Sequence, residues 1–187
     1  MSGRTSGEGA PADAPAPIDP RLRAQYCFGC GEHNPIGLRL HFERDGEGVS
    51  ARYRPRREDQ GFPDLFHGGL LSLLLDEAMG WAMYADEIFA VTARMETRFR
   101  RPVPLDRPLI VRSRIRSRRG RRLEVEAELC HAPDDAPDAA PDGAATDAED
   151  GTRGALLAEA SGLFVRMPPA KEQAALARFR EEHDEHA

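Results

Sequence analysis

Apolar residues in this chain fall into several short alternating runs and one long run that is apolar on nearly every side. Residues 37–42 and 48–53 alternate between apolar and polar positions, so they predict two strands joined by a turn at Gly46. Residues 69–84 are helical in length and apolar almost all round, which is typical of a helix buried on most sides. Four further strands are predicted at residues 90–99, 109–118, 123–131 and 155–165. A charged helix is predicted at residues 170–182.

This order of elements predicts an α+β fold. A helix that is apolar all round needs more cover than loops supply, and the economical solution is a curved antiparallel β-sheet wrapped around one long central helix. We expect a disordered tail at residues 1–20, one domain at 21–168, and a charged tail or short helix at 169–187. Within the domain, residues 132–152 are rich in Asp, Ala and Pro and predict a disordered acidic insertion.

Composition excludes several classes of protein. The net charge is −6, which argues against general nucleic-acid binding. No run of 18 apolar residues occurs, so we expect no membrane span. Three cysteines cannot build a disulfide framework, and the first 20 residues lack the basic and apolar regions of a signal peptide, so we expect a cytoplasmic protein with reduced thiols.

Three stretches of the chain resemble the hotdog-fold thioesterase superfamily, specifically the PaaI-like (phenylacetate-pathway type) acyl-CoA thioesterases. They are CFGCGEHNPIGLRLHF at residues 27–42, an HGG-x6-D pattern at 67–76, and VTARMETRFRRPVPL at 91–105. The resemblance implies a hotdog fold and hydrolysis of an acyl-CoA thioester to a free acid and coenzyme A. It also implies no metal, no cofactor apart from the coenzyme A of the substrate, and a homodimer or homotetramer with the site at the subunit interface.

Asp76 is the strongest candidate for the chemistry. A carboxylate among leucines is costly to bury without a function or a partner, and it suits either a general base that activates water or a nucleophile that attacks the thioester. The sequence leaves both mechanisms open. Glu77 is the internal rival, but it lies 100° around the helix, and the HGG-x6 spacing favours Asp76. We therefore interpret Glu77 as a residue that faces solvent or an interface.

Gly68 is the candidate oxyanion-binding residue, because backbone N–H groups at a helix N-terminus are free and the helix dipole favours negative charge there. Asp76 follows eight residues later, about 12 Å along an ideal helix. If both groups act on one carbonyl, they must come from different subunits. Thr92 corresponds to a hydroxyl residue that lines the site in the family, and we expect it to orient the attacking water.

Further residues are expected to bind substrate. His67 and Gly69 flank the oxyanion position, and Gly69 allows a close backbone approach. The resemblance implies an Asn six residues before the histidine, but this chain has Gly61 there, so we expect the neighbouring amide of Gln60 to substitute. Arginines suit the phosphates of coenzyme A, and the candidates are Arg101, Arg121 and Arg122.

Two features leave alternatives open. Cys27 and Cys30 form a C-x2-C pair, but a structural zinc normally needs a second pair, so we predict a tight N-terminal turn that packs on the sheet and no metal. The missing Asn makes a non-catalytic acyl-CoA-binding dimer the main alternative function. A hotdog hydratase or dehydratase is less favoured, because Gly61 stands where such an enzyme needs a histidine.

Overall fold

The computed structural model describes residues 18–132 and 154–185. The elements in chain order are the 3-10 turn η1 Pro20–Leu22, strands β1 Glu43–Asp45 and β2 Gly48–Tyr53, the turn η2 Arg57–Asp59, helix α1 Gly68–Tyr84, strands β3 Ala90–Phe99, β4 Leu109–Arg119, β5 Arg122–His131 and β6 Leu156–Arg166, and helix α2 Pro169–Asp184. Residues 1–17 and 133–153, which hold most of the predicted tail and insertion, lie outside the described residues, so those predictions stay predictions.

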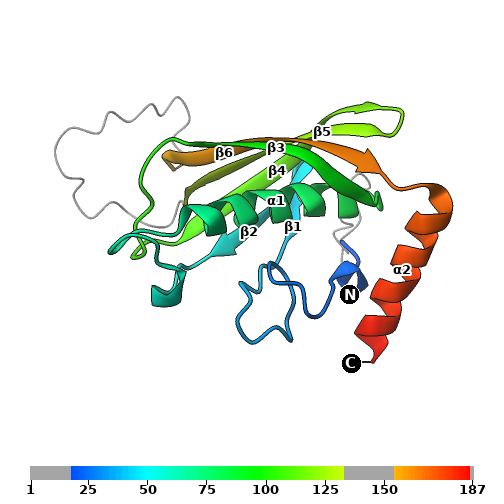
Figure 1. Cartoon of the computed structure of the whole chain (residues 1–187), viewed down its shortest axis with the longest axis horizontal. Helices are drawn as coiled ribbons and strands as arrows, with labels where there is room; N and C mark the ends of the chain where they lie inside the picture. The colour runs from blue at the N-terminus through cyan, green and yellow to red at the C-terminus, as the bar shows by residue number, and fades with distance from the viewer. Residues whose placement is uncertain (1–17, 133–153, 186–187) are drawn as a thin grey trace, which may run out of the picture.

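One antiparallel sheet with the strand order β1-β2-β4-β5-β6-β3 forms the main layer. Helix α1 lies along one face of this sheet, and α2 extends from the end of β6 (Figure 1). The predicted α+β fold, a curved antiparallel sheet around one central helix, is confirmed. Strand β3 forms one edge of the sheet.

Helix α1 is buried because two different layers cover it. Leu74, Leu75, Ala78 and Met79 are completely buried, and they share one face of the helix, because positions i, i+1, i+4 and i+5 span about 140°. The sheet covers one side, and the segment between η1 and β1 crosses the other side (Figure 1). An apolar helix therefore receives part of its cover from a loop as well as from the sheet.

The strand predicted at residues 37–42 is wrong. Leu38, Leu40 and Phe42 are buried and alternate with exposed residues, as the pattern indicates. However, Arg39 has φ 53°, a left-handed conformation that interrupts a strand. The N–H groups of Leu38 and Leu40 donate to the carbonyls of Phe28 and Gly29 at 2.8 and 2.9 Å, so this segment pairs with the N-terminal loop. The sheet begins only at β1.

The other predicted strands are present with small shifts in their ends. Gly46 and Gly120 have φ values of 57° and 60°, which glycine adopts without steric cost, and they form the tight turns of the β1–β2 and β4–β5 hairpins. Helix α2 is held at its first turn by Glu172. Its carboxylate accepts from the N–H of Phe89 at 3.0 Å and pairs with Arg166 at 3.0 Å.

Candidate active site

The N-terminus of α1 presents a free backbone donor to solvent. His67 caps the helix, because its Nδ1 accepts from the N–H of Gly69 at 2.9 Å. A side chain at Gly69 would approach the His67 ring to 2.9 Å, so the cap requires glycine there. Within the described residues, the N–H of Gly68 makes no hydrogen bond, and Gly68 is exposed. The free donor is therefore at Gly68, and the donor of Gly69 is used by His67.

Asp59 anchors the loop that leads into α1. Its carboxylate is buried and accepts from the hydroxyl of Tyr53 at 2.5 Å, from the N–H of Arg56 at 2.7 Å and from the Arg56 guanidinium at 3.0 Å. Burial alone would raise the pKa of Asp59, but the hydrogen bonds from Arg56 and Tyr53 outweigh it and hold the pKa below its usual value. The Asp59 carbonyl accepts from the N–H of His67 at 2.9 Å. A carboxylate whose acceptor sites are occupied by hydrogen bonds thus holds the loop that precedes α1 in place.

Gln60 lies in the same loop, beside the histidine. Its Oε1 accepts from the N–H of Asp64 at 3.0 Å, and residue 60 bridges to Phe66, next to His67. A Cβ at Gly61 would lie 3.0 Å from the Cα of His67, so the turn leaves little room for a side chain there. The structure therefore brings Gln60 close to the start of α1, with its amide oxygen used inside the loop.

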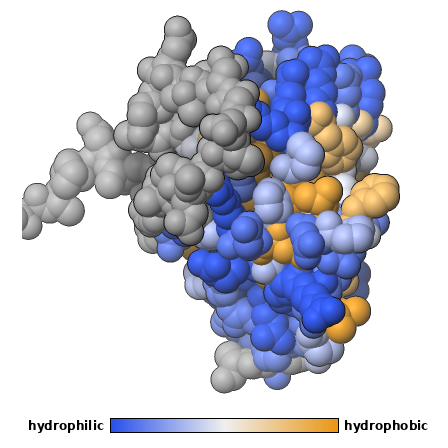
Figure 2. Space-filling view, turned by 90° about the vertical axis from the view of Figure 1, so that its left-hand side faces the viewer, coloured by the Kyte–Doolittle hydropathy of each residue, from blue (hydrophilic) through white to orange (hydrophobic). Residues whose placement is uncertain are grey.

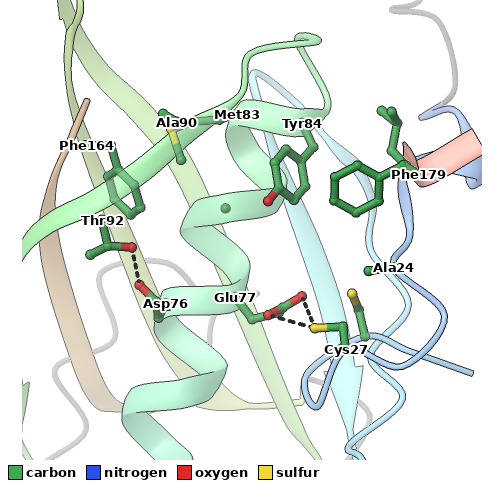
Figure 3. A pocket seen from close by; sticks show the side chains of 13 residues that line it. Ala24, Cys27, Asp76, Glu77, Met83, Tyr84, Ala90, Thr92, Phe164 and Phe179 are labelled. Atoms are coloured by element: carbon green, nitrogen blue, oxygen red, sulfur yellow. Dashed lines mark hydrogen bonds between the residues drawn. The ribbon is translucent and has the colours of Figure 1, made fainter. Parts of the chain in front are cut away.

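Asp76 faces strand β3 in the middle of α1. The hydroxyl of Thr92 donates to Asp76 Oδ1 at 3.1 Å, and Figure 3 shows this pair between helix and strand. The pairing of β3 with β6 shifts register between Thr92 and Arg94, and such a bulge re-aims neighbouring side chains. Within the described residues, Asp76 has no other hydrogen-bond donor, so Oδ2 is available to a ligand.

A cavity of about 140 Å³ opens beside this pair. Most of its walls are apolar or aromatic, and the polar groups gather on α1, β3 and the N-terminal loop. Burial raises the pKa of Tyr84, so its hydroxyl stays protonated and neutral. The lining residues are Leu22, Ala24, Cys27, Cys30, Asp76, Glu77, Gly80, Met83, Tyr84, Ala90, Thr92, Phe164 and Phe179.

Glu77 does not face solvent, contrary to the interpretation from the sequence. Its carboxylate accepts from Trp81 Nε1 at 3.2 Å and from Cys27 Sγ at 3.6 and 3.7 Å, and Figure 3 shows it pointing away from Asp76 toward the N-terminal loop. Burial raises the pKa of Glu77 to about 7. The turn that contains Cys27 and Cys30 therefore packs on α1 and not, as predicted, on the sheet.

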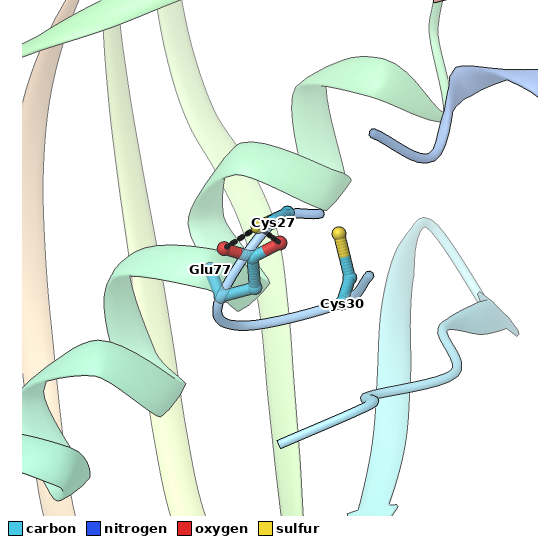
Figure 4. Close-up of side chains that lie close together, drawn as sticks. All are labelled: Cys27, Cys30 and Glu77. Carbon is cyan, nitrogen blue, oxygen red and sulfur yellow. Dashed lines mark hydrogen bonds between the residues drawn. The ribbon is translucent and has the colours of Figure 1, made fainter. Parts of the chain in front are cut away.

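The two thiols of this turn influence one another. A hydrogen bond from Cys30 lowers the pKa of Cys27 to about 5, and the same interaction raises the pKa of Cys30. Figure 4 shows both sulfurs beside the Glu77 carboxylate. The three side chains bring their sulfur and oxygen atoms within 4.8 Å of one another.

The candidate arginines are not gathered at one place in a single chain. The N–H of Arg101 donates to the carbonyl of Leu157 at 3.1 Å, and Arg121 Nε donates to the carbonyl of Arg166 at 3.0 Å. Leu157 and Arg166 lie at opposite ends of β6. Arg122 is exposed beside Arg121 at the β4–β5 turn.

Gly68 and Asp76 are likewise separated along α1. Gly68 begins the helix and Asp76 lies two turns further. The exposed surface near Gly68 includes the ring of Phe99, whose atoms would lie 3.8 Å from a Cβ at this glycine. Figure 2, which views the end of the molecule that contains the start of α1, shows apolar surface interrupted by polar groups.

Sequence reasoning missed Asp59 and misplaced Glu77, two carboxylates that shape this region. Asp59 is buried through contacts with neighbours three and six residues away, and the sequence signal was an acidic residue three positions after Arg56. Glu77 meets Cys27 across 50 residues, and no local pattern marks such a contact.

None of the described helices combines the length and apolar composition of a membrane span. The family model of the thioesterase superfamily matches residues 64–137. A Bos taurus protein named acyl-coenzyme A thioesterase THEM4 is 28% identical over 112 residues, which cover 60% of this chain and 38% of that relative. The match therefore spans well under half the length of this relative.

Solved structures agree with this match. The crystal structure of RHA08564, described as a thioesterase superfamily protein, is 26% identical, with a TM-score of 0.62, and covers 84% of this chain and 70% of that one. The PaaI protein of the E. coli phenylacetic acid degradation operon has the same fold, with 16% identity, a TM-score of 0.56 and coverage of 70% and 81%. The chain therefore has the hotdog fold, and it resembles the thioesterase superfamily over residues 64–137.

Proposed function

We propose that this protein is an acyl-CoA thioesterase, which hydrolyses an acyl-CoA to a free acid and coenzyme A. The observation that carries the proposal is the Asp76–Thr92 pair, a carboxylate with one free oxygen beside a cavity that both apolar and polar side chains line. The name of the bovine relative supports an acyl-CoA as the substrate. The reaction needs no redox cofactor, and the number of cysteines favours a cytoplasmic location.

Asp76 acts on water or on the thioester itself. As a general base, its free Oδ2 accepts a proton from water while Thr92 holds Oδ1; the hydroxide formed attacks the carbonyl carbon and the coenzyme A thiolate leaves. As a nucleophile, the carboxylate attacks the carbonyl, expels the thiolate and forms an anhydride that water then hydrolyses. A single turnover in ¹⁸O-labelled water identifies the nucleophilic route when water attacks the Asp76 carbonyl of the anhydride, because label then enters Asp76; the general-base route never labels this residue.

The Gly68 N–H stabilises the developing oxyanion in the proposed site. Gly68 and Asp76 lie about 12 Å apart along one helix, so one carbonyl meets both only if a second copy of the chain supplies one of them. The edge strand β3 supports a dimer, because no strand among residues 18–132 and 154–185 pairs with its outer side, and Val91 and Phe99 of this strand are 52% and 55% exposed. Such an edge favours pairing with another chain.

The same dimer would gather the arginines. If two β3 edges pair antiparallel, the end of β3 in one copy lies beside the beginning of β3 in the other. Arg101 of one copy would then lie near Arg121 and Arg122 of the second, because these residues mark opposite ends of β6. We assign this cluster to the phosphates of coenzyme A. Gln60, His67 and Gly69 shape the approach to the oxyanion position.

Thiol release from short, medium, long and aromatic acyl-CoAs tests the proposal. Wild type and Asp76→Ala are compared, and the exposed Asp106→Asn serves as the matched control for removing an aspartate charge. Turnover of one substrate that falls at least ~100-fold in the folded Asp76→Ala, and stays unchanged in the control, supports the assignment. Binding of acyl-CoA without thiol release would favour the non-catalytic alternative, for which the crowded turn at Gly61, without an amide side chain, is the specific observation.

A further inference from the structure

We propose that Cys27, Cys30 and Glu77 form a binding site for a thiophilic divalent cation, best matched by Zn²⁺, which joins the N-terminal loop to helix α1. The inference does not rest on the proposed thioesterase activity, because it concerns residues that the hydrolysis does not use. It revises the expectation of no metal. That expectation counted cysteine pairs, and the sequence gives no sign that Glu77 joins the C-x2-C pair.

The distances fit a tetrahedral site. With Zn–S bonds of about 2.3 Å and Zn–O bonds of about 2.1 Å, a tetrahedron has S···O edges of about 3.6 Å. Cys27 Sγ lies 3.6 and 3.7 Å from the two oxygens of Glu77. Cys30 Sγ lies within 4.8 Å of the other two ligand atoms, so a bound ion would have to draw this sulfur closer to both of them.

The donor set also suits a cation. Two thiols and a carboxylate share a largely buried space, and in the described part of the chain no lysine or arginine forms an ion pair with Glu77. A buried anion without a countercharge is costly. A bound divalent cation offsets two of the three negative charges of this carboxylate and the two thiolates, and sulfur ligands select zinc over magnesium or calcium.

The loop is shaped closely around the carboxylate (Figure 4). A Cβ at Gly29 would lie 2.5 Å from Glu77 Oε2, and one at Gly31 would lie 2.5 Å from the carbonyl of Gln25. Both glycines therefore allow the turn to fold over Glu77. The three ligands also line the cavity next to Asp76, so water from the cavity can complete a fourth position. A bound ion would hold the loop that forms this cavity wall.

Cobalt substitution tests the site directly. The full-length chain, free of any tag and purified with reductant and chelator, is titrated with Co²⁺ while the absorption spectrum is recorded. We expect one equivalent to produce a thiolate-to-cobalt charge-transfer band and the visible bands of a tetrahedral site, and Zn²⁺ to abolish both. Zn²⁺ should also raise Tm, since it binds the folded chain. These measurements need no acyl-CoA, so they are independent of a failed hydrolysis assay.

Variants identify the ligands. Cys27→Ser and Cys30→Ser should abolish the charge-transfer band and weaken Zn²⁺ binding at least ~100-fold, whereas Glu77→Gln should retain the band and weaken binding about 10-fold. Cys130→Ala removes the third cysteine, in β5, and should leave the cobalt bands and Zn²⁺ binding unchanged. Circular dichroism establishes that each variant is folded.

Three results would overturn the proposal. The first is a folded, reduced wild type that gives no cobalt bands. The second is a spectrum that survives in both cysteine variants or disappears in Cys130→Ala. The third is a reduced protein that takes up no metal but forms a Cys27–Cys30 disulfide with peroxide, which would assign the pair to thiol redox chemistry.

Discussion

Asp59 and Asp76 are carboxylates near the same helix, but their surroundings differ. Asp59 accepts several hydrogen bonds from Tyr53 and Arg56 and lies buried under the loop that leads into α1. Asp76 accepts one hydrogen bond, from Thr92, and lines a cavity. A carboxylate with saturated acceptors stabilises a fold, whereas one with a free oxygen beside a cavity can accept a proton. The comparison predicts that substitution at the first affects stability and substitution at the second affects activity.

The largest effect is expected at Asp76. Asp76→Asn keeps the side-chain shape and the acceptor for Thr92 but removes the base or nucleophile, so kcat should fall about 10³-fold while Tm changes little. The measurement is coenzyme A release together with thermal unfolding. Glu77→Gln is the matched control on the next residue and should lower kcat less than about 10-fold. Equal losses in both variants would contradict the assignment of the chemistry to Asp76.

Gly68→Pro removes a single backbone donor. His67 precedes it with φ −67° and ψ 127°, a conformation that suits a residue before proline, and proline is well accepted at the first position of a helix. The change should lower kcat about 10²-fold, as expected for loss of an oxyanion donor. Gly68→Ala keeps the N–H and meets only the Phe99 ring at ordinary contact distance, so it is the control. If Gly68→Ala also lost activity, the loss in Gly68→Pro would be explained by a steric clash and not by the missing N–H donor.

Asp59→Asn should show the reverse pattern to Asp76→Asn. It removes a buried charge that is paired with Arg56, so the free energy of unfolding at pH 7 should fall by about 2–3 kcal/mol. Because the folded-state pKa of Asp59 is lowered, its stabilisation is complete above the ordinary carboxyl pKa and is lost as the pH falls through the lowered value.

Urea unfolding of wild type and Asp59→Asn at pH 7 and at acidic pH checks this. The gap in stability between the two proteins should narrow on acidification, and kcat of the folded variant should stay within about 10-fold of wild type. A gap that widens at low pH would mean that the folded-state pKa is raised.

Thr92→Val should have the smallest effect. It removes the hydroxyl that orients Asp76 and keeps a β-branched residue that suits a strand. We expect about a 10-fold fall in kcat with little change in KM, measured on the best substrate of the acyl-CoA panel. Thr92→Ser restores the donor and should recover most of the rate. Failure of Ser to recover it would show that the methyl group, and not the hydrogen bond, matters at this position.

Much of the fold could be predicted, because local periodicity reports burial. Residues 123–131 alternate between apolar and polar positions, and they form β5, in which the apolar positions from Leu123 to Leu129 are the buried ones. The same logic failed at residues 37–42: the alternation correctly identified Leu38 and Leu40 as buried, but a backbone partner cannot be inferred from it, and Arg39 adopts a positive φ.

The candidate site could be predicted where neighbours in the chain decide the geometry. The helix begins at Gly68, one residue before the predicted start. The contact of Asp76 with Thr92 joins residues 16 positions apart and was not predicted from the pattern. Glu77 was misplaced because the residues that surround it, Cys27 and Gly29, come from a distant loop. Periodicity describes which residues are neighbours on one helix. It therefore cannot predict the distance between Gly68 of one copy and Asp76 of another.

The unpaired edge of β3 has a consequence for mixtures of defective proteins. If two copies join there and each site takes Gly68 from one copy and Asp76 from the other, Gly68→Pro and Asp76→Asn are defects of different halves of a site. When the two inactive proteins are unfolded and refolded together, half of the pairs are mixed, and each mixed pair rebuilds one intact site of its two. About a quarter of the wild-type activity should return. Complementation between two alleles that are inactive alone would then report that two chains associate through the β3 edge and share each site.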